Sequence, residues 1–185
     1  MIKNRLFPGV LLLILTVIVL AACGGGAEQE PAQSQNQAQE EASEAADVVT
    51  TASIVNTNQA FLQAISSDGT WIIATLKDLS FDQDLVLEGA FTNRDTPARK
   101  IALYTQDADR NVTARFTLSA PKLTVRSENA RIQGGTFNGD VYVEAPNFLI
   151  TDATVQGSVY FSSQEYRDSF QMTNGGAVTG ELIVQ

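Results

Sequence analysis

The spacing of apolar and polar residues repeats in the C-terminal half of the chain. Residues 136–143 (TFNGDVYV) and 154–161 (TVQGSVYF) carry Thr, Gly, Val and Tyr at corresponding positions, 18 residues apart. A looser copy at 178–184 (VTGELIV) follows after 23 residues, and residues 163–169 are the simplest insertion that accounts for the difference. Similarity at a fixed period is typical of units that bury their apolar face by stacking on copies of themselves.

Each repeat consists of very short runs of β-branched and aromatic residues separated by Gly, Asn, Asp or Pro. This pattern predicts a strand, a turn and a strand, with no room for a helix. The stacked arrangement that fits is a right-handed parallel β-helix, in which each coil of about 18–25 residues adds one layer about 4.8 Å thick. We therefore expect an all-β solenoid of about five to seven layers.

Alternation within the repeats predicts which side chains face the core. Tyr142 and Tyr160 each lie between two apolar neighbours, and successive side chains of a strand point to opposite faces. If the neighbours fill the core, the two tyrosines stack outside, as a structural ladder or as a modest carbohydrate platform. The opposite register would bury the tyrosines. The residues expected inside, in vertical register, are Val141, Val143, Val159 and Phe161.

One helix is predicted before the first strands. Residues 56–58 (NTN) offer N-caps, Phe61, Leu62 and Ile65 form one apolar face, and residues 66–69 (SSDG) end the helix. A single amphipathic helix in front of a solenoid is expected to cover its open first coil, because terminal layers need a cap.

Strand signals continue after this helix. Residues 71–76 and 85–87 predict the first strands. Two alternating runs, 101–105 and 112–118, flank the polar residues 106–111. This middle region is either a local hairpin or two faces of one wide coil.

The N-terminus carries a targeting signal. Lys3 and Arg5 precede the apolar run 10–20, and the chain's single cysteine follows a pair of alanines. The sequence LAAC ending at Cys23 resembles the lipobox of bacterial lipoproteins. That resemblance implies cleavage after Ala22 and a diacylglyceryl group on Cys23, which would anchor the protein at the extracytoplasmic face of a bacterial plasma or outer membrane. The alternatives are a secreted protein with a chance cysteine or a membrane-spanning anchor, for which the apolar run is short.

Three regions follow from this signal: the signal peptide 1–22, the lipidated cysteine with its tether 23–47, and the folded domain 48–185. Residues 24–47 contain six acids, no base and no aromatic residue, a composition that predicts disorder. The domain carries ten bases against fifteen acids, a net charge of −5. This acidic balance disfavours nucleic acid as a partner, and a single cysteine excludes an intrachain disulfide.

Two families share the pattern in part. The recurring motif Gly-x-apolar-aromatic-apolar at 139–143 and 157–161 resembles the bactofilins, which are polymer-forming cytoskeletal β-helix proteins, over roughly 123–184. This resemblance implies a scaffold that self-associates through the ends of its solenoid. The order of helix, Asp-Gly, apolar strand and LVLEG over about 57–91 resembles the N-terminal cap and first coil of pectate-lyase-like proteins. That resemblance implies a module that binds or cleaves acidic polysaccharides.

Candidate catalytic groups are few. The chain has no histidine, so no histidine-dependent scheme is available. Glycoside hydrolysis needs two carboxylates facing one groove. The candidate pairs, Asp82 with Asp84 and Asp107 with Asp109, lie in turn-like stretches where Asp is favoured for its turn chemistry. We find no phosphate loop or metal-ligand spacing, and therefore expect no cofactor, no metal and no enzymatic activity.

The densest charge in the domain lies in its middle region. A solvated loop would explain it, and the alternative is a site that contacts sugar or peptide. The residues of this cluster are Arg94, Arg99, Lys100, Asp107, Asp109 and Arg110.

The last apolar run, Leu182, Ile183 and Val184, is followed in this sequence by Gln185 alone. An uncovered terminal coil presents unpaired backbone groups to other chains. With one end capped by a helix, we expect these residues to form a self-association edge that closes a dimer rather than a filament.

Taken together, these patterns predict a membrane-anchored lipoprotein whose β-helix is a non-enzymatic, self-associating scaffold of the cell envelope. The alternative function is a polysaccharide-binding or weakly degrading module that contacts cell-wall or extracellular polysaccharide.

Overall fold

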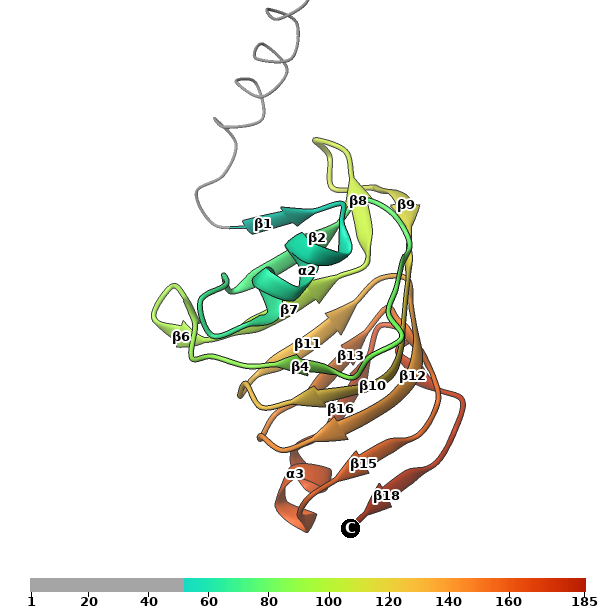
Figure 1. Ribbon diagram of the computed structural model, residues 1–185. Helices are drawn as coiled ribbons and strands as arrows, with labels where there is room; N and C mark the ends of the chain where they lie inside the picture. The colour runs from blue at the N-terminus through green and yellow to red at the C-terminus, as the bar shows by residue number, and fades with distance from the viewer. Residues whose placement is uncertain (1–51) are drawn as a thin grey trace, which may run out of the picture. The chain divides into compact units, whose positions relative to one another are not determined.

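Parallel strand pairing dominates residues 52–185, the part of the chain that this computed structural model describes (Figure 1). The class is all-β, with the two helices α2 (Asn58–Ile65) and α3 (Gln164–Ser169) in the described part. The predicted signal peptide, Ala22, Cys23 and the tether lie outside the described residues. No helix within 52–185 is long and apolar enough to cross a membrane.

The first sheet has six parallel strands. The chain returns to this sheet after each strand, and we call the stretch from one of these strands to the next a passage of the chain. Because neighbours in this sheet are separated by a whole passage, every strand pair joins residues far apart in sequence. In order, the strands are β1 (Ala52–Val55), β2 (Ile72–Thr75), β7 (Arg99–Ala102), β11 (Ala130–Gln133), β13 (Leu149–Thr151) and β16 (Gln171–Thr173).

The second sheet has eight strands in two branches that share its long central members. The shared strands are β10 (Thr117–Val125) and β12 (Thr136–Val143). Along one branch, β3 pairs with the first half of β10, β14 with the first half of β12, and β17 with β14. Along the other, β4 pairs with the second half of β10, β15 with the second half of β12, and β18 with β15, all in parallel. The remaining bounds are β3 (Leu79–Ser80), β4 (Leu85–Leu87), β14 (Thr154–Gln156), β15 (Val159–Phe161), β17 (Ala177–Val178) and β18 (Leu182–Val184).

Interior side chains stack in columns through both sheets. In the first sheet, four isoleucines occupy aligned positions on consecutive strands and are fully buried. The second sheet has the register that the repeat predicts, with Val141 opposite Val159 and Val143 opposite Phe161, all buried. The stacked isoleucines are Ile73, Ile101, Ile132 and Ile150.

Tyr142 and Tyr160 confirm the predicted alternation. They are paired directly across β12 and β15 and are half-buried between fully buried neighbours. Their rings stack with centroids 4.6 Å apart and planes 19° apart. The expectation of an external tyrosine ladder is therefore correct, and the register that buries the tyrosines is excluded.

The repeated glycine marks a place where successive passages of backbone come very close. A Cβ on Gly157 would overlap the carbonyl oxygen of Gly139, and one on Gly180 would overlap the carbonyl of Gly157. The Gly180 amide donates to the Gly157 carbonyl at 2.9 Å. Glycine recurs at this position because no side chain fits between the stacked corners.

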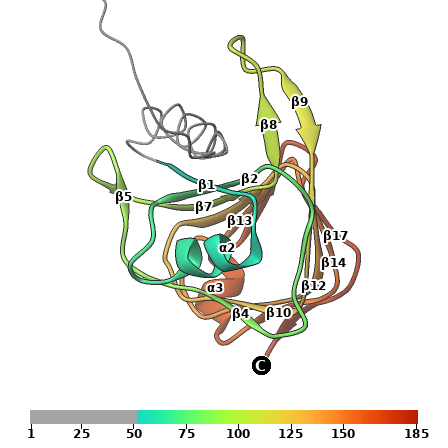
Figure 2. The same ribbon diagram turned by 45° about the horizontal axis from the view of Figure 1, so that its top comes forward.

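Helix α2 is confirmed in position and, for the most part, in its predicted apolar face, since Leu62 is half-buried and Ala64 is buried as well. The Thr57 side chain caps it by accepting from the Ala60 amide at 3.1 Å, and Phe61 and Ile65 are buried. One expectation needs correction, because the helix does not precede the first strand. Strand β1 comes before it and pairs in parallel with β2, so α2 connects two neighbouring strands. Figure 2 shows the helix lying across that end of the sheets.

Two hairpins project from the parallel strands. Strands β5 (Thr92–Asn93) and β6 (Thr96–Pro97) form a short one, and β8 (Tyr104–Gln106) and β9 (Val112–Arg115) form a longer one. The middle region therefore combines both predicted alternatives. Its centre is an antiparallel hairpin, while β7 before it and β10 after it belong to the two parallel sheets.

The insertion between the second and third repeats forms a helix, for which the sequence analysis made no structural prediction. Ser163 caps α3 by accepting from the Tyr166 amide at 3.3 Å, Glu165 lies in the first turn and Arg167 in the last. These charges favour a helix through its dipole. The helix has six residues and buries none of them, so it leaves no apolar periodicity in the sequence.

Candidate functional site

The first candidate site is the layer formed by β16, β17 and β18, at the opposite end from α2 in Figure 1. Each of these strands is paired on one side only within residues 52–185. Met172 continues the buried isoleucine column but is 45% exposed, and Val184 continues the Phe161 column but is 41% exposed. The layer thus presents core-type side chains together with unpaired strand edges.

The predicted edge residues Leu182, Ile183 and Val184 belong to this layer as strand β18. Leu182 and Val184 continue the interior columns and Ile183 continues the tyrosine ladder. The predicted strand is confirmed, whereas self-association through it stays a prediction. The sequence did not indicate that β16 and β17 contribute to the same face, since neither run is strongly apolar.

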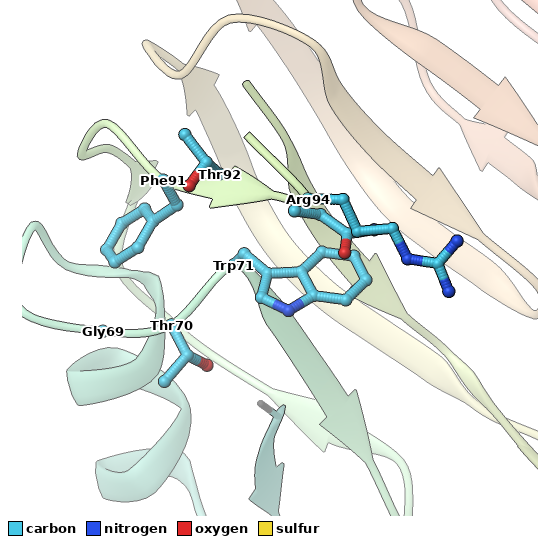
Figure 3. A pocket seen from close by; sticks show the side chains of 7 residues that line it. Gly69, Thr70, Trp71, Phe91, Thr92 and Arg94 are labelled. Atoms are coloured by element: carbon cyan, nitrogen blue, oxygen red, sulfur yellow. The ribbon is translucent and has the colours of Figure 1, made fainter. Parts of the chain in front are cut away.

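The second candidate site is a pocket of about 850 Å³ near the α2 end. One wall is the segment Gly69, Thr70 and Trp71, which leads into β2. The other wall, residues 91–94, runs from Phe91 into the β5–β6 hairpin. Figure 3 shows the Phe91 ring and the Arg94 side chain on opposite sides of the Trp71 indole.

The buried side chain of Arg99 contacts both walls of the pocket. It is 1% exposed, and its guanidinium donates to the carbonyls of Ala64 and Ser66, both at 2.9 Å, and to the carbonyl of Thr70. The same group lies 4.0 Å from the centroid of the Phe91 ring. Burial lowers the pKa of Arg99 to about 10, so the side chain is charged at neutral pH.

The charge of Arg99 has a structural reason. The last carbonyls of a helix lack partners and carry the negative end of its dipole. The carbonyls of Ala64 and Ser66 lie at the end of α2, and Arg99 supplies the donors that they need. A cation in this position is therefore stabilised by the helix end and by the face of Phe91.

The predicted charged cluster is not one site. Arg94 lines the pocket and Arg99 is buried beneath it, whereas the acids and Arg110 lie in the turn of the β8–β9 hairpin. The expectation of a single solvated or ligand-contacting loop is therefore corrected. A buried arginine was not foreseen because its partners are 29 to 35 residues away in sequence.

Two of the four candidate carboxylates, Asp84 and Asp107, have side-chain partners in the structure. Asp107 accepts from the Asn111 amide at 2.8 Å and from its side chain at 3.1 Å, and these hydrogen bonds lower the pKa of Asp107. Asp109 lies in the same exposed turn. Asp84 forms an ion pair with Lys122 at 2.7 Å, which raises the pKa of that lysine. Within 52–185, no three His, Cys, Asp or Glu side chains are grouped to hold a metal.

Comparison with known proteins adds no functional residue to this description. No family model matches the chain, and no curated protein or solved structure shows significant similarity to it. Trp71 and Phe91 are the site residues that sequence reasoning missed. The available signal was that Trp71 is the chain's only tryptophan and opens the predicted strand 71–76 beside a Gly-containing turn.

Proposed function

We propose that this protein is a lipid-anchored, non-enzymatic scaffold at the extracytoplasmic face of a bacterial membrane, and that its folded part is a small right-handed parallel β-helix. The five passages of chain that supply paired strands to both sheets support the solenoid. So do the unbroken columns of interior side chains and the glycine at the tight corner. Each passage would be one coil, stabilised mainly by its neighbours.

The observation that carries the scaffold function is the uncovered layer. Ile150 and Phe161 are fully buried, while the residues aligned with them one layer on, Met172 and Val184, are 45% and 41% exposed. Exposed strand edges bind other strands through their free N–H and C=O groups. A second copy of this layer offers the same edges and the same apolar columns, so the layer fits a self-complementary contact.

The other end of the fold favours a closed assembly. Helix α2 buries Phe61, Ala64 and Ile65 across that end, and the Phe61 ring packs 5.5 Å from Phe81. A head-to-tail filament would need two uncovered ends. The arrangement with one covered end is a two-fold dimer that joins the C-terminal layers, each dimer being held to the membrane by two anchors.

The anchor in this proposal is a lipid on Cys23, after cleavage behind Ala22, with the acidic tether as the spacer. Two or three acyl chains suffice for stable membrane attachment. The proposal does not need a cofactor, a metal or nucleic acid. It places the β-helix at the envelope surface, where a dimer could connect two membrane-attached chains.

Sedimentation velocity of the full chain in density-matched detergent tests the scaffold function. We expect a monomer–dimer equilibrium that shifts towards the dimer as the protein concentration rises. A protein that stays monomeric at high micromolar concentration would contradict self-association. Growth into long fibres would contradict the closed dimer and favour a filament.

A further inference from the structure

We propose that the pocket between Trp71, Phe91 and Arg94 binds a sugar ring that carries a carboxylate, as a residue of an acidic glycan. This inference concerns a different part of the fold from the self-association layer and does not depend on the scaffold function. It rests on which groups line the pocket, on how its walls are fixed, and on the placement of its one charge.

The lining groups match a sugar ring. Trp71 and Phe91 are half-exposed aromatic residues, and around them lie the hydroxyls of Thr70 and Thr92 and the amide of Asn93. One face of a pyranose ring presents C–H groups, which pack on the electron-rich face of an aromatic ring. Its rim presents hydroxyls that pair with side chains of this kind. The volume of about 850 Å³ is in the range of pockets for small molecules.

The charge in the pocket selects the kind of sugar. Arg94 is the only ionisable residue among the seven that line it. A guanidinium pairs with a carboxylate through two parallel hydrogen bonds, which gives both direction and strength. Since no acid is among the lining residues, the pocket offers a carboxylate an attractive partner without a competing charge. The absence of a lining carboxylate also leaves no acid–base pair for hydrolysis, so the site is one for binding.

The walls are held in place before any ligand arrives. The buried Arg99 guanidinium hydrogen-bonds the Thr70 carbonyl in one wall and lies under the Phe91 ring in the other. The Ala98 amide donates to the Phe91 carbonyl at 2.9 Å, and the Lys100 amide donates to the Trp71 carbonyl at 2.7 Å. A site whose walls are fixed by supporting contacts loses less conformational entropy when it binds.

The backbone around Arg94 is strained. Arg94 and Asp95 form the two-residue turn between β5 and β6, with φ angles of 50° and 62°. Turns of this type normally take Asn or Gly, because positive φ is unfavourable for residues with a larger side chain. From this turn the Arg94 side chain extends past the Trp71 indole, on the side away from Phe91 (Figure 3). Strain of this kind is common at binding sites.

The chain contains its own probe for this pocket. Trp71 is the only tryptophan, so the protein's indole emission reports on the pocket alone. The full chain in detergent is titrated with a trigalacturonate and, separately, with sialyllactose, which carry their carboxylates on different sugars. The matched ligands are the same oligosaccharides with each carboxylate reduced to an alcohol. We expect saturable emission changes with at least one acidic oligosaccharide, and roughly tenfold weaker binding of its reduced form.

Three variants complete the test. Arg94→Gln is expected to weaken binding of the acidic oligosaccharide roughly tenfold and to remove its advantage over the reduced one. The matched control is Arg110→Gln, because Arg110 also has a positive φ in a hairpin turn but does not line the pocket. It should bind as the wild type does. By calorimetry, Trp71→Ala should lose at least roughly tenfold in affinity, while Trp71→Phe keeps most of it.

Each outcome of these experiments either supports the proposal or overturns it. No saturable change with either acid at low millimolar concentration overturns the proposal, as does equal binding of acidic and reduced forms. Equal effects of Arg94→Gln and Arg110→Gln also overturn it, because the charge would then act non-specifically. If Trp71→Ala does not fold by circular dichroism, the comparison of Arg94→Gln with Arg110→Gln decides. The two acidic ligands distinguish a uronate from a sialic-acid type of sugar.

Discussion

Ile150 and Met172 occupy the same position on neighbouring strands of one sheet, yet Ile150 is fully buried and Met172 is 45% exposed. Three isoleucines stack before them at the aligned positions of earlier strands, and all are buried. The column therefore continues to the surface of the last layer instead of ending under a cap. The self-association proposal concerns this surface.

Met172→Asp should prevent dimerisation while leaving the fold intact. The substitution places a charge where a second copy would bury an apolar side chain, and an unpaired buried charge is costly. In the monomer the position is already half-exposed, so we expect a change in unfolding free energy of less than about 1 kcal/mol. The measurement is sedimentation velocity over a range of concentrations. Val112→Asp is the control, since Val112 is 43% exposed on a hairpin away from this layer.

Proline substitutions at two adjacent positions of β18 should distinguish pairing with a second copy from pairing within the fold. The Gln185 amide donates to the Phe161 carbonyl, so the amides of Ile183 and Gln185 face β15 and that of Val184 faces the open side. Val184→Pro removes an outward donor and should weaken dimerisation, whereas Ile183→Pro removes an inward one and should also release β18. Hydrogen exchange at β15 distinguishes them. Unchanged dimerisation in Val184→Pro would show that the edge does not pair with a second copy.

Much of the parallel pairing could be read from the sequence because the repeat leaves two independent signals. The 18-residue spacing sets the register between β12, β14 and β15, and the alternation around Tyr142 and Tyr160 sets which face is inside. Both signals lie in short stretches of sequence, so they can be recognised without knowledge of the fold. The repeated glycine is explained in the same way, because each passage of the chain brings its backbone close to the previous passage at the same position of the repeat.

Other features could not be read because their causes are not local. Arg99 reads as a surface charge until α2 and Thr70 are folded against it. Strand β1 has four residues and makes sense only beside β2, with which it pairs. The pocket joins a turn before β2 to a hairpin after β4, so neither wall alone signals a site. Helix α3 has a cap and suitable charges but no buried face to produce a period.

Gly157→Ala should destabilise the protein by about 2 kcal/mol or more, because the new methyl group overlaps the Gly139 carbonyl and the backbone must shift. Gly175→Ala is the control for backbone conformation. Gly175 has a φ of +82° but open space around it, so alanine there should cost only about 1 kcal/mol. Urea denaturation monitored by circular dichroism gives both values. Equal costs would mean that the corner can relax around a side chain.

Cys23→Ser should leave an uncleaved precursor that no fatty-acid probe labels. The prediction follows from the sequence LAAC, in which the thiol of the only cysteine would carry the lipid. The measurement is metabolic labelling with an alkyne fatty acid, together with the mass of the N-terminal peptide. Ser34→Ala, a change within the tether, serves as the control and should be processed normally. Normal cleavage and membrane attachment of Cys23→Ser would exclude the lipoprotein assignment.

Arg99→Met should destabilise the fold by about 2–4 kcal/mol. Methionine fills much of the space of the arginine stem but leaves the carbonyls of Ala64, Ser66 and Thr70 without donors, and unpaired buried acceptors cost about 1–3 kcal/mol each before relaxation. Arg99→Lys should recover only part of this loss, because a single ammonium cannot reproduce the planar fork or its stacking on Phe91. Arg110→Met, in an exposed turn, should change stability by less than about 0.5 kcal/mol. Urea denaturation provides the comparison, and a fully stable Arg99→Lys would show that charge alone, rather than the geometry of the guanidinium, ties α2 to the walls of the pocket.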